Sequence, residues 1–269
     1  MRKVRFEGKK KIASTISFVS GKGGVGKTSL AIKSAKILAE NGHRTLLIDC
    51  DYNLSNTLVK MNLPLNDNFY HLISAQKRFS DCLIKQGSLH LLPGCNGSIN
   101  LFESKLEYDK IIFDIIHAHE EDYDFIILDC PAGMDQKILN LCAYCDDRFF
   151  IVVPDKSSIT DSYSLMKILK LRYGINENHL IINRYLHNPQ MEKVAGSLIE
   201  TAKKFIHIDV HFLGGIKEFD QKFDQFDQFI MDSGSSSLND QVLKVIRNYA
   251  EEWRGMKDGL MGQPVAHRP

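Results

Sequence analysis

The sequence predicts an α/β fold with a mainly parallel central sheet and helices on both of its faces. Three observations support this prediction. Short apolar runs rich in β-branched residues alternate with helical patterns along essentially the whole chain. A glycine-rich loop joins the first of these runs to a helical pattern, and two later runs end in Asp49 and Asp129. Because the carboxyl ends of parallel strands meet at one edge of the sheet, we expect the functional site at that edge.

The composition fits one large domain. The chain has 269 residues and a formal net charge of +1, so it can bury a sizeable core, and its charge gives no general attraction to nucleic acid. No apolar run approaches the about 20 residues needed to span a bilayer, and the N-terminus lacks the apolar segment of a signal peptide. We therefore expect a cytoplasmic protein with a basic flexible arm over residues 1–11, a single domain over residues 12–254 and a frayed tail over residues 255–269.

The segment Ser20–Ser29 reads SGKGGVGKTS and has the G-x-x-x-x-G-K-[ST] spacing of a phosphate-binding loop. Its glycines let consecutive backbone N–H groups turn inward, some at positive φ, and the helix that follows adds a partial positive charge. Lys27 can reach the β- and γ-phosphates, and the Thr28 hydroxyl can bind Mg²⁺. The loop therefore predicts a site for ATP and Mg²⁺.

A dinucleotide site is the alternative reading of the same glycines. Gly21, Gly23 and Gly26 also spell G-x-G-x-x-G, and Asp49 stands where a dinucleotide fold keeps its ribose-binding acid. Lys27 and Thr28 favour the triphosphate, because a dinucleotide loop has no use for them. The later strand that ends in Asp129 favours it as well.

The first half of the chain shows its elements through apolar runs and turn signals. Asn41-Gly42 ends the helix that follows the loop, and Pro93-Gly94 ends a later strand. The expected elements are strand 16–19, helix 30–39, strand 44–49, short helices at 71–73 and 81–84, and strand 89–92.

In the second half, strand 124–129 is a buried apolar run with an acid at its carboxyl end, the Walker B arrangement. We expect Ser158 or Thr160 to cap the helix that starts near residue 157, because a hydroxyl oxygen can accept an N-terminal N–H. The other expected elements are helix 111–118, helix 138–145, strand 148–153, strand 179–182, helix 191–206, strand 211–214 and an amphipathic helix at 238–253.

Lys22 gives the loop its family character. Residues 22–28 read K-G-G-V-G-K-T, which resembles the deviant Walker A pattern K-G-G-x-G-K-[ST] of the MinD/ParA family. The resemblance implies a P-loop NTPase of SIMIBI-like type, in which Lys22 crosses to the nucleotide of a second subunit. It therefore implies an ATP-dependent homodimer. A solvated loop lysine is the alternative.

The acids at and after the ends of the second and fourth expected strands match the same family. Asp49, Asp51 and Asn56 fit its D-x-D-x-x-x-x-N pattern, and the resemblance implies that Asp49 lies near the Mg²⁺ shell while Asp51 orients the attacking water. Either acid could instead cap the next helix. Asp129 would hold Mg²⁺ through a water. Residues 130–133, C-P-A-G, resemble the family's turn that senses the γ-phosphate, with a purely structural turn as the alternative.

The pair Asn183-Arg184 ends a predicted strand, and in the family such a pair places the asparagine amide against the adenine edge. A plain turn residue is the alternative for Asn183. Together, the residues expected to bind nucleotide are Gly21, Lys22, Gly23, Gly24, Val25, Gly26, Lys27, Thr28, Ser29, Asn183 and Arg184. The expected metal-site residues are Thr28, Asp49, Asp51 and Asp129, and the expected catalytic residues are Lys22, Lys27, Asp51 and Asp129.

Within the family, two segments resemble the flagellar FlhG (FleN/YlxH) group: the P-G-x-x-G turn at 93–97 and the S-I-T-D segment at 158–161. The resemblance implies a regulator of flagellar number and placement that works with the FlhF GTPase or another flagellar regulator. Residues 1–11 lack the D-Q-A-x-x-L-R element that many FlhG proteins carry. A MinD-type division ATPase, a ParA-type segregation ATPase and a scaffold without significant turnover remain open.

Three further features have structural readings. Cys142-x-x-Cys145 could be half of a metal site, although buried thiols are favoured because no second pair has ligand spacing. Phe219, Phe223, Phe226 and Phe229 form a stripe at helical period, which indicates core packing. The interleaved acids argue against nucleic-acid binding there. The final helix is expected to pack on the domain, with membrane attachment at the inner face as the alternative.

Overall fold

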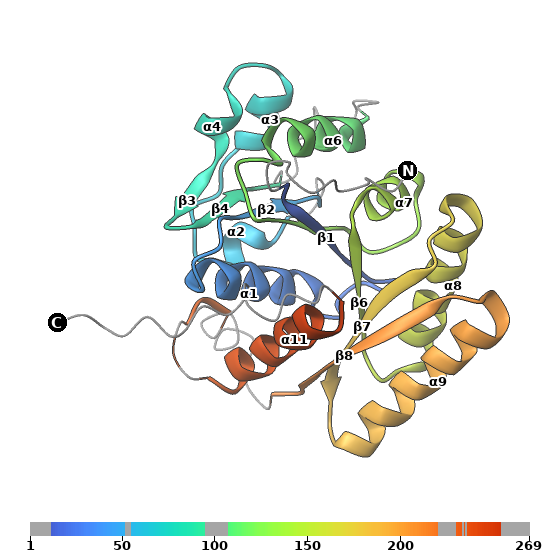
Figure 1. The fold of residues 1–269 in the computed structure, drawn as a ribbon. Coiled ribbons are helices and arrows are strands. Elements are labelled where there is room, and N and C mark those ends of the chain that lie inside the picture. Colours follow the sequence, from blue (N-terminus) through green and yellow to red (C-terminus); the bar gives the residue numbers. More distant parts are fainter. Residues whose placement is uncertain are drawn as a thin grey trace.

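A computed structural model of the chain describes residues 12–51, 55–94, 107–219, 230–232, 234 and 236–253. Its centre is an eight-stranded sheet in the order β3-β4-β2-β5-β1-β6-β7-β8 (Figure 1). Every neighbouring pair is parallel except β3 and β4. The predicted mainly parallel sheet is therefore confirmed.

The strands are β1 (Ser14–Val19), β2 (Thr45–Asp49), β3 (Ile84–Gln86), β4 (Leu89–Leu92), β5 (Phe125–Asp129), β6 (Asp147–Val152), β7 (Glu177–Tyr185) and β8 (Asp209–Lys217). The helices are α1 (Lys27–Glu40), α2 (Thr57–Lys60), α3 (Asn68–Ile73), α4 (Phe79–Cys82), α6 (Tyr108–His119), α7 (Gln136–Tyr144), α8 (Lys156–Tyr173), α9 (Asn188–Ile206) and α11 (Ser237–Trp253).

Helices cover both faces of the sheet, as the sequence predicts. Buried residues of α6, α7, α8 and α9 join one apolar core, and those of α1 and α11 join the other. Figure 1 shows α1 and α11 side by side on their face. The strands between the two cores are buried on both sides, which explains why they read as continuous apolar runs.

The sequence missed β3. This strand has three residues and pairs antiparallel with β4 through a turn at Gly87, where φ is +60°. Three half-exposed or exposed residues carry no readable periodicity, so the sequence predicts a helix through residue 84. The helix α4 ends instead at Cys82, and Ile84 begins the strand.

The predicted cap of α8 is wrong. Asp155 occupies the N-cap position, and its carboxylate accepts the backbone N–H of Ser158 at 2.8 Å. The Ser158 hydroxyl instead accepts the N–H of Val153 at 3.1 Å, while Thr160 donates to the Lys156 carbonyl inside the helix. A carboxylate just before the helix is a better cap than the hydroxyls one turn later, because it also meets the helix dipole.

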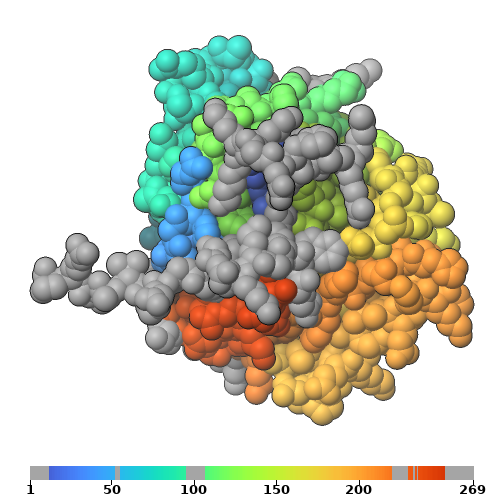
Figure 2. Space-filling view, in the orientation of Figure 1, coloured from blue at the N-terminus to red at the C-terminus, as the bar shows by residue number. Residues whose placement is uncertain are grey.

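The final helix α11 packs on the domain, as expected. Its apolar side faces α1 and the sheet, and Figure 2 shows its outer side at the surface beside α9 and β8. The buried residues are Leu238, Val242, Val245, Ile246, Tyr249 and Ala250. In the part of the chain that the structure describes, no helix is long and apolar enough to cross a membrane. The basic arm at 1–11, residues 223, 226 and 229 of the phenylalanine stripe, and the tail from residue 255 lie outside the described residues; Phe219 packs against the α1–α11 core.

Cys142 of α7 and Cys145, which follows the end of that helix, are buried, as expected for packed thiols. Cys142 and Cys145 are almost fully inaccessible. Among the described residues, no group of three or more histidine, cysteine, aspartate or glutamate side chains is arranged to hold a metal ion.

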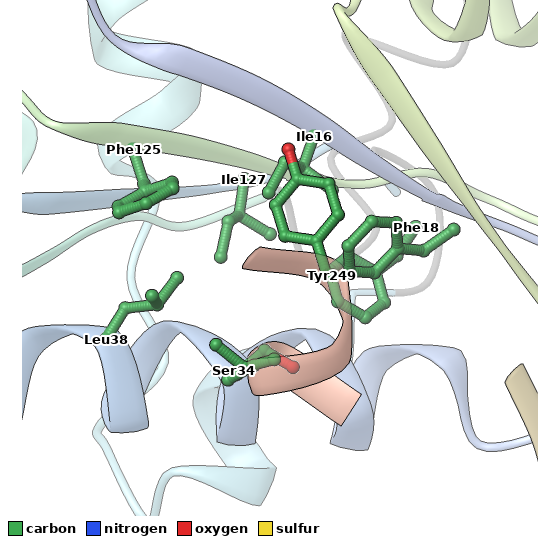
Figure 3. Close-up of a pocket in the computed structure, with 9 residues that line it drawn as sticks. Ile16, Phe18, Ser34, Leu38, Phe125, Ile127 and Tyr249 are labelled. Carbon is green, nitrogen blue, oxygen red and sulfur yellow. The ribbon is translucent and has the colours of Figure 1, made fainter. Parts of the chain in front are cut away.

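A small cavity of about 10 Å³ lies between α1, α11 and the strands β1, β5 and β6. This volume admits at most one water, and its apolar lining favours a dry void. Figure 3 shows the Tyr249 ring reaching from α11 toward Phe18 and Ile16 of β1. The Tyr249 hydroxyl donates to the buried Asp147 carboxylate at 2.5 Å, so one polar contact ties α11 to β6.

Replacing Tyr249 by phenylalanine should therefore lower the free energy of unfolding by roughly 1–3 kcal/mol, because the buried carboxylate loses a donor. Urea unfolding followed by circular dichroism measures this change. Tyr173→Phe is the matched control, since that hydroxyl bonds Asn140 nearer the surface. If the two variants lose the same free energy of unfolding, the proposed contribution of the Tyr249 hydrogen bond to stability is wrong.

Candidate functional site

The candidate site lies at the carboxyl edge of the sheet, where β1, β2 and β5 end together. Phe18 and Asp49 are the register partners of Asp129 on the two sides of β5. The glycine loop leaves β1 directly beside this point and leads into α1. The topology thus brings the loop and the two strand-end acids to one place, as the sequence predicts.

The loop adopts backbone angles that require glycine. Gly24 has φ +75° and Gly26 has φ +91°, which side chains rarely tolerate. Gly26 is the N-cap of α1 and has no side-chain cap, so the first N–H groups of the helix face the loop. Val25 is buried and anchors the loop to the core. This geometry suits an anion held by main-chain N–H groups.

Gly21 is needed for a different reason. A Cβ at this position would lie 2.4 Å from the backbone carbon of Asp161 in α8. The start of the loop therefore packs directly on the first turns of α8, the segment that resembles the FlhG group.

One of the two strand-end acids, Asp129, faces a cation. Lys27 Nζ lies 3.5 Å from Asp129 Oδ1, with side chains that are 11% and 3% exposed. Burial raises the pKa of Asp129, while Lys27 and the Thr28 hydroxyl lower it. Burial and the charge of Asp129 raise the pKa of Asp49 to about 6. The Ser55 hydroxyl donates to Asp49 at 2.5 Å, a contact that the sequence did not predict.

This donor set fits Mg²⁺. Asp129 Oδ1 is buried and accepts no hydrogen bond among the described residues, and Thr28 lies beside the same carboxylate. Hard oxygen donors that leave room for waters and phosphate are what Mg²⁺ prefers. Thr28, Asp49 and Asp129 are thus the residues that could hold the ion, with Lys27 next to them.

The raised pKa of Asp49 leads to a prediction for the ligand-free protein. A folded-state pKa of about 6, above the unfolded value of 3.8, means that the folded state binds the proton more tightly. Stability should then fall as the pH rises from about 4 to 6, by roughly 2–3 kcal/mol relative to Asp49→Asn. Chemical unfolding of both proteins across this range tests the sign. If the difference in unfolding free energy between the two proteins does not change with pH, the prediction is wrong.

Asp51 follows β2 at the edge of the site. Its backbone N–H donates to Asp49 Oδ1 at 2.9 Å, so its main chain is tied to the metal-site acid. The N-cap of the next helix, α2, is Asn56 and makes no side-chain capping bond. The alternative that Asp49 or Asp51 caps α2 is therefore not supported. Residues 52–54 lie outside the described part of the chain.

Lys22 makes an ion pair within its own chain. Its Nζ lies 3.1 Å from Asp155 Oδ2, and the two side chains are 42% and 40% exposed. Hydrogen bonds from Ser158 and Ser157 and the Lys22 charge lower the pKa of Asp155 to about 2. In this conformation Lys22 is paired with Asp155 and remains partly exposed to solvent. Sequence reasoning missed Asp155, although an acid directly before a helix is a readable signal.

Asn183 lies within β7 and its side chain reaches the loop. Its amide Nδ2 donates to the Val25 carbonyl at 2.7 Å, and the residue is 6% exposed. A plain turn residue at the strand end, the alternative reading, is wrong, because β7 continues to Tyr185. Arg184 is exposed and has φ +55°.

The turn after Asp129 lies against the start of the loop. Cys130 N–H donates to the Phe18 carbonyl at 3.2 Å, and Gly133 N–H donates to the Ser20 carbonyl at 3.3 Å. Gly133 has φ +117°, a backbone conformation that favours glycine. A change at the start of the loop would thus reach this turn through the Gly133–Ser20 main-chain bond.

Comparisons with known proteins agree with this geometry. A family model described as an AAA domain matches residues 13–187. The antiactivator FleN of Pseudomonas aeruginosa is 23% identical over 242 residues, which cover 88% of this chain and 86% of FleN. The septum site-determining protein MinD of Bacillus subtilis is 26% identical over 223 residues, which cover 78% of each chain.

Among solved structures, MinD of Pyrococcus horikoshii in complex with Mg-ADP superposes with a TM-score of 0.74 at 20% identity. The match covers 94% of this chain and 100% of that one. This likeness confirms the predicted P-loop NTPase fold. Since the family model spans more than half of the chain, the chain belongs to the AAA-domain family, and its relatives place it in the MinD/ParA group of P-loop ATPases.

Proposed function

We propose that this protein is a switch that binds ATP with Mg²⁺, forms a homodimer in the ATP state and hydrolyses ATP slowly to release it. The observation that carries the proposal is the convergence of Lys27, Asp49 and Asp129 beneath a glycine loop with a second, partly exposed lysine, Lys22. The Mg-ADP complex of the P. horikoshii MinD supports the choice of cofactor.

In the proposed reaction, water attacks the γ-phosphate in line with the bond to the leaving ADP. Asp51 holds that water, and Lys27 stabilises the charge that develops on the phosphate oxygens. Mg²⁺ would neutralise charge on the β- and γ-phosphates when bound beside Thr28, Asp49 and Asp129. Lys22 of a second subunit would complete the site, so turnover should depend on dimerisation.

Within the group, we propose an FlhG-type regulator of flagellar number or placement. Support comes from the FleN relative, of which this chain covers 86%, and from the FlhG-like segment of α8 that packs on Gly21. The FlhF GTPase is the proposed partner class, and no sequence-specific nucleic acid is part of the proposal. We place the protein in the cytoplasm, where it could associate peripherally with the membrane.

Lys22 provides the test of the dimer. Lys22→Ala should keep Mg-ATP affinity within about threefold, because Lys22 pairs with Asp155 rather than with the strand-end acids, yet it should lose ATP-dependent dimerisation and most of the turnover. Sedimentation velocity and phosphate release measure these effects. The control is Lys156→Ala. Lys156 is an exposed lysine at the start of α8, the helix whose Asp161 packs against the loop. A Lys22→Ala variant that still dimerises with ATP would refute the proposed role.

The competing functions separate in three assays on the wild-type protein. ATP-dependent sedimentation with liposomes would favour a MinD-type function, and salt-sensitive binding to nonspecific DNA would favour a ParA-type function. ATP-dependent binding to FlhF, with neither of those activities, is the result expected for the FlhG type. Dimerisation without any phosphate release would indicate a scaffold.

A further inference from the structure

The contact between Asn183 and the glycine loop joins segments 158 residues apart. The asparagine is a buried polar side chain of the sheet, and its Nδ2 donates to the Val25 carbonyl at 2.7 Å. A role limited to the adenine edge does not require this bond. The contact therefore points to a role of Asn183 in the loop itself.

The fit between Asn183 and the loop leaves no spare space. A Cβ on Gly26 would lie 2.4 Å from Asn183 Nδ2, far closer than such atoms approach each other. Gly26 also has φ +91°. Glycine at this position thus serves the backbone conformation and the approach of the asparagine together.

The strand is distorted where it presents the asparagine. The register of β7 on β8 shifts between Asn183 and Tyr185, and Arg184 between them has φ +55°. Such irregularities re-aim the side chains next to them. The backbone strain at Arg184 is consistent with a local conformation held for the sake of its neighbour.

The trans geometry of the peptide bond determines how this contact orients the loop backbone. No peptide bond among the described residues is cis, and in a trans peptide the C=O and the following N–H point in opposite directions. Because Asn183 holds the Val25 carbonyl toward β7, the Gly26 N–H is turned the other way. We propose that Asn183 is a positioning residue for the phosphate site, which fixes the Val25–Gly26 peptide so that the Gly26 N–H faces the bound phosphate.

This role rests on the proposed binding of ATP and extends it. An asparagine amide has two N–H donors and a carbonyl acceptor, so one donor on Val25 leaves the other donor and the acceptor for the adenine edge. Asn183 would then connect the base to the loop that holds the phosphates. The distinguishing consequence is that phosphate binding should depend on Asn183 even when no base is present.

The test uses Mg²⁺-tripolyphosphate, which lacks a base, next to Mg-ATP. Isothermal titration calorimetry gives both dissociation constants for the wild type, Asn183→Leu and Asn183→Ala. Leucine keeps the approximate size without the donor, and alanine removes the side chain. Asn178→Ala is the matched control, because Asn178 is a buried asparagine at the other end of β7. Melting temperatures establish that each variant is folded.

We expect both Asn183 variants to bind tripolyphosphate roughly three- to tenfold more weakly, since one buried hydrogen bond is lost, and the control to bind it as the wild type does. The Gly26 amide resonance should shift when the wild type binds tripolyphosphate, and this shift should shrink in Asn183→Leu. Weaker binding of ATP with unchanged tripolyphosphate affinity would reduce Asn183 to a base contact and overturn the proposal. Unchanged affinity for both ligands would overturn it too, whereas a wild type that binds neither would refute the proposed function itself.

Discussion

Replacing Lys27 by alanine is expected to weaken Mg-ATP binding at least about 100-fold, the largest effect on affinity in this chain. The lysine is 11% exposed and has Asp129 as its neighbour at 3.5 Å, so its charge acts in a site with little water. Hydrogen bonds from a cation to phosphate are about twice as strong as neutral ones, and two of them account for this change. Calorimetric titration with a nonhydrolysable ATP analogue measures it.

The same variant should also unfold more easily without nucleotide. Asp129 would keep its burial and lose the cation beside it, and breaking a buried pair costs about 3–5 kcal/mol unless the acid takes up a proton. Lys36→Ala is the control, since Lys36 pairs with Glu40 on the same helix at 2.8 Å, away from the acids. The Lys36→Ala substitution should lower the free energy of unfolding by less than about 1 kcal/mol. Affinity for ATP within threefold of the wild type in Lys27→Ala would exclude the loop as the phosphate site.

Replacing Asp51 by alanine is expected to lower the rate of ATP hydrolysis about 100-fold or more, which is the usual contribution of a residue that positions or deprotonates the nucleophile. Binding of Mg-ATP should stay within about threefold, because the contact of residue 51 with Asp49 uses the backbone N–H, which alanine retains. The dimer should accumulate, because ATP still binds and forms it but is not hydrolysed to release it. Phosphate release under single-turnover conditions and light scattering measure the two effects.

Asp67→Ala provides the comparison for Asp51. Asp67 is an exposed aspartate at the start of α3 and makes no side-chain capping bond, so its loss should leave turnover unchanged. If Asp51→Ala hydrolyses ATP at the wild-type rate, Asp51 has no part in the reaction, and the water must be held by another group.

The features that the sequence predicts well are local. The loop, the strand-end acids Asp49 and Asp129 and the alternation of strands with helices are each encoded within a few residues. Parallel pairing then brings the acids together without further information, because register partners at the ends of β2 and β5 must meet. This is why both the fold class and the position of the site follow from the sequence.

The features that the sequence does not predict depend on distant partners. Asp155 meets Lys22 across 133 positions and Asn183 meets Val25 across 158, and no periodicity in the chain relates such pairs. The positive φ of Arg184 cannot be predicted from the sequence either, because it depends on how β7 packs beside β8 and the loop. The three-residue strand β3 is too short to show alternation.

The strand order also determines when the protein can fold during its synthesis. The first strand to leave the ribosome, β1, lies between β5 and β6, so it has no neighbour until residue 125 and only one until residue 147 is made. Its loop and α1 must wait longer still, since their face is completed by α11 near the end of the chain. The nascent chain thus holds a central, buried strand unpaired through about half of translation, and a non-local topology of this kind favours slow folding that benefits from chaperones.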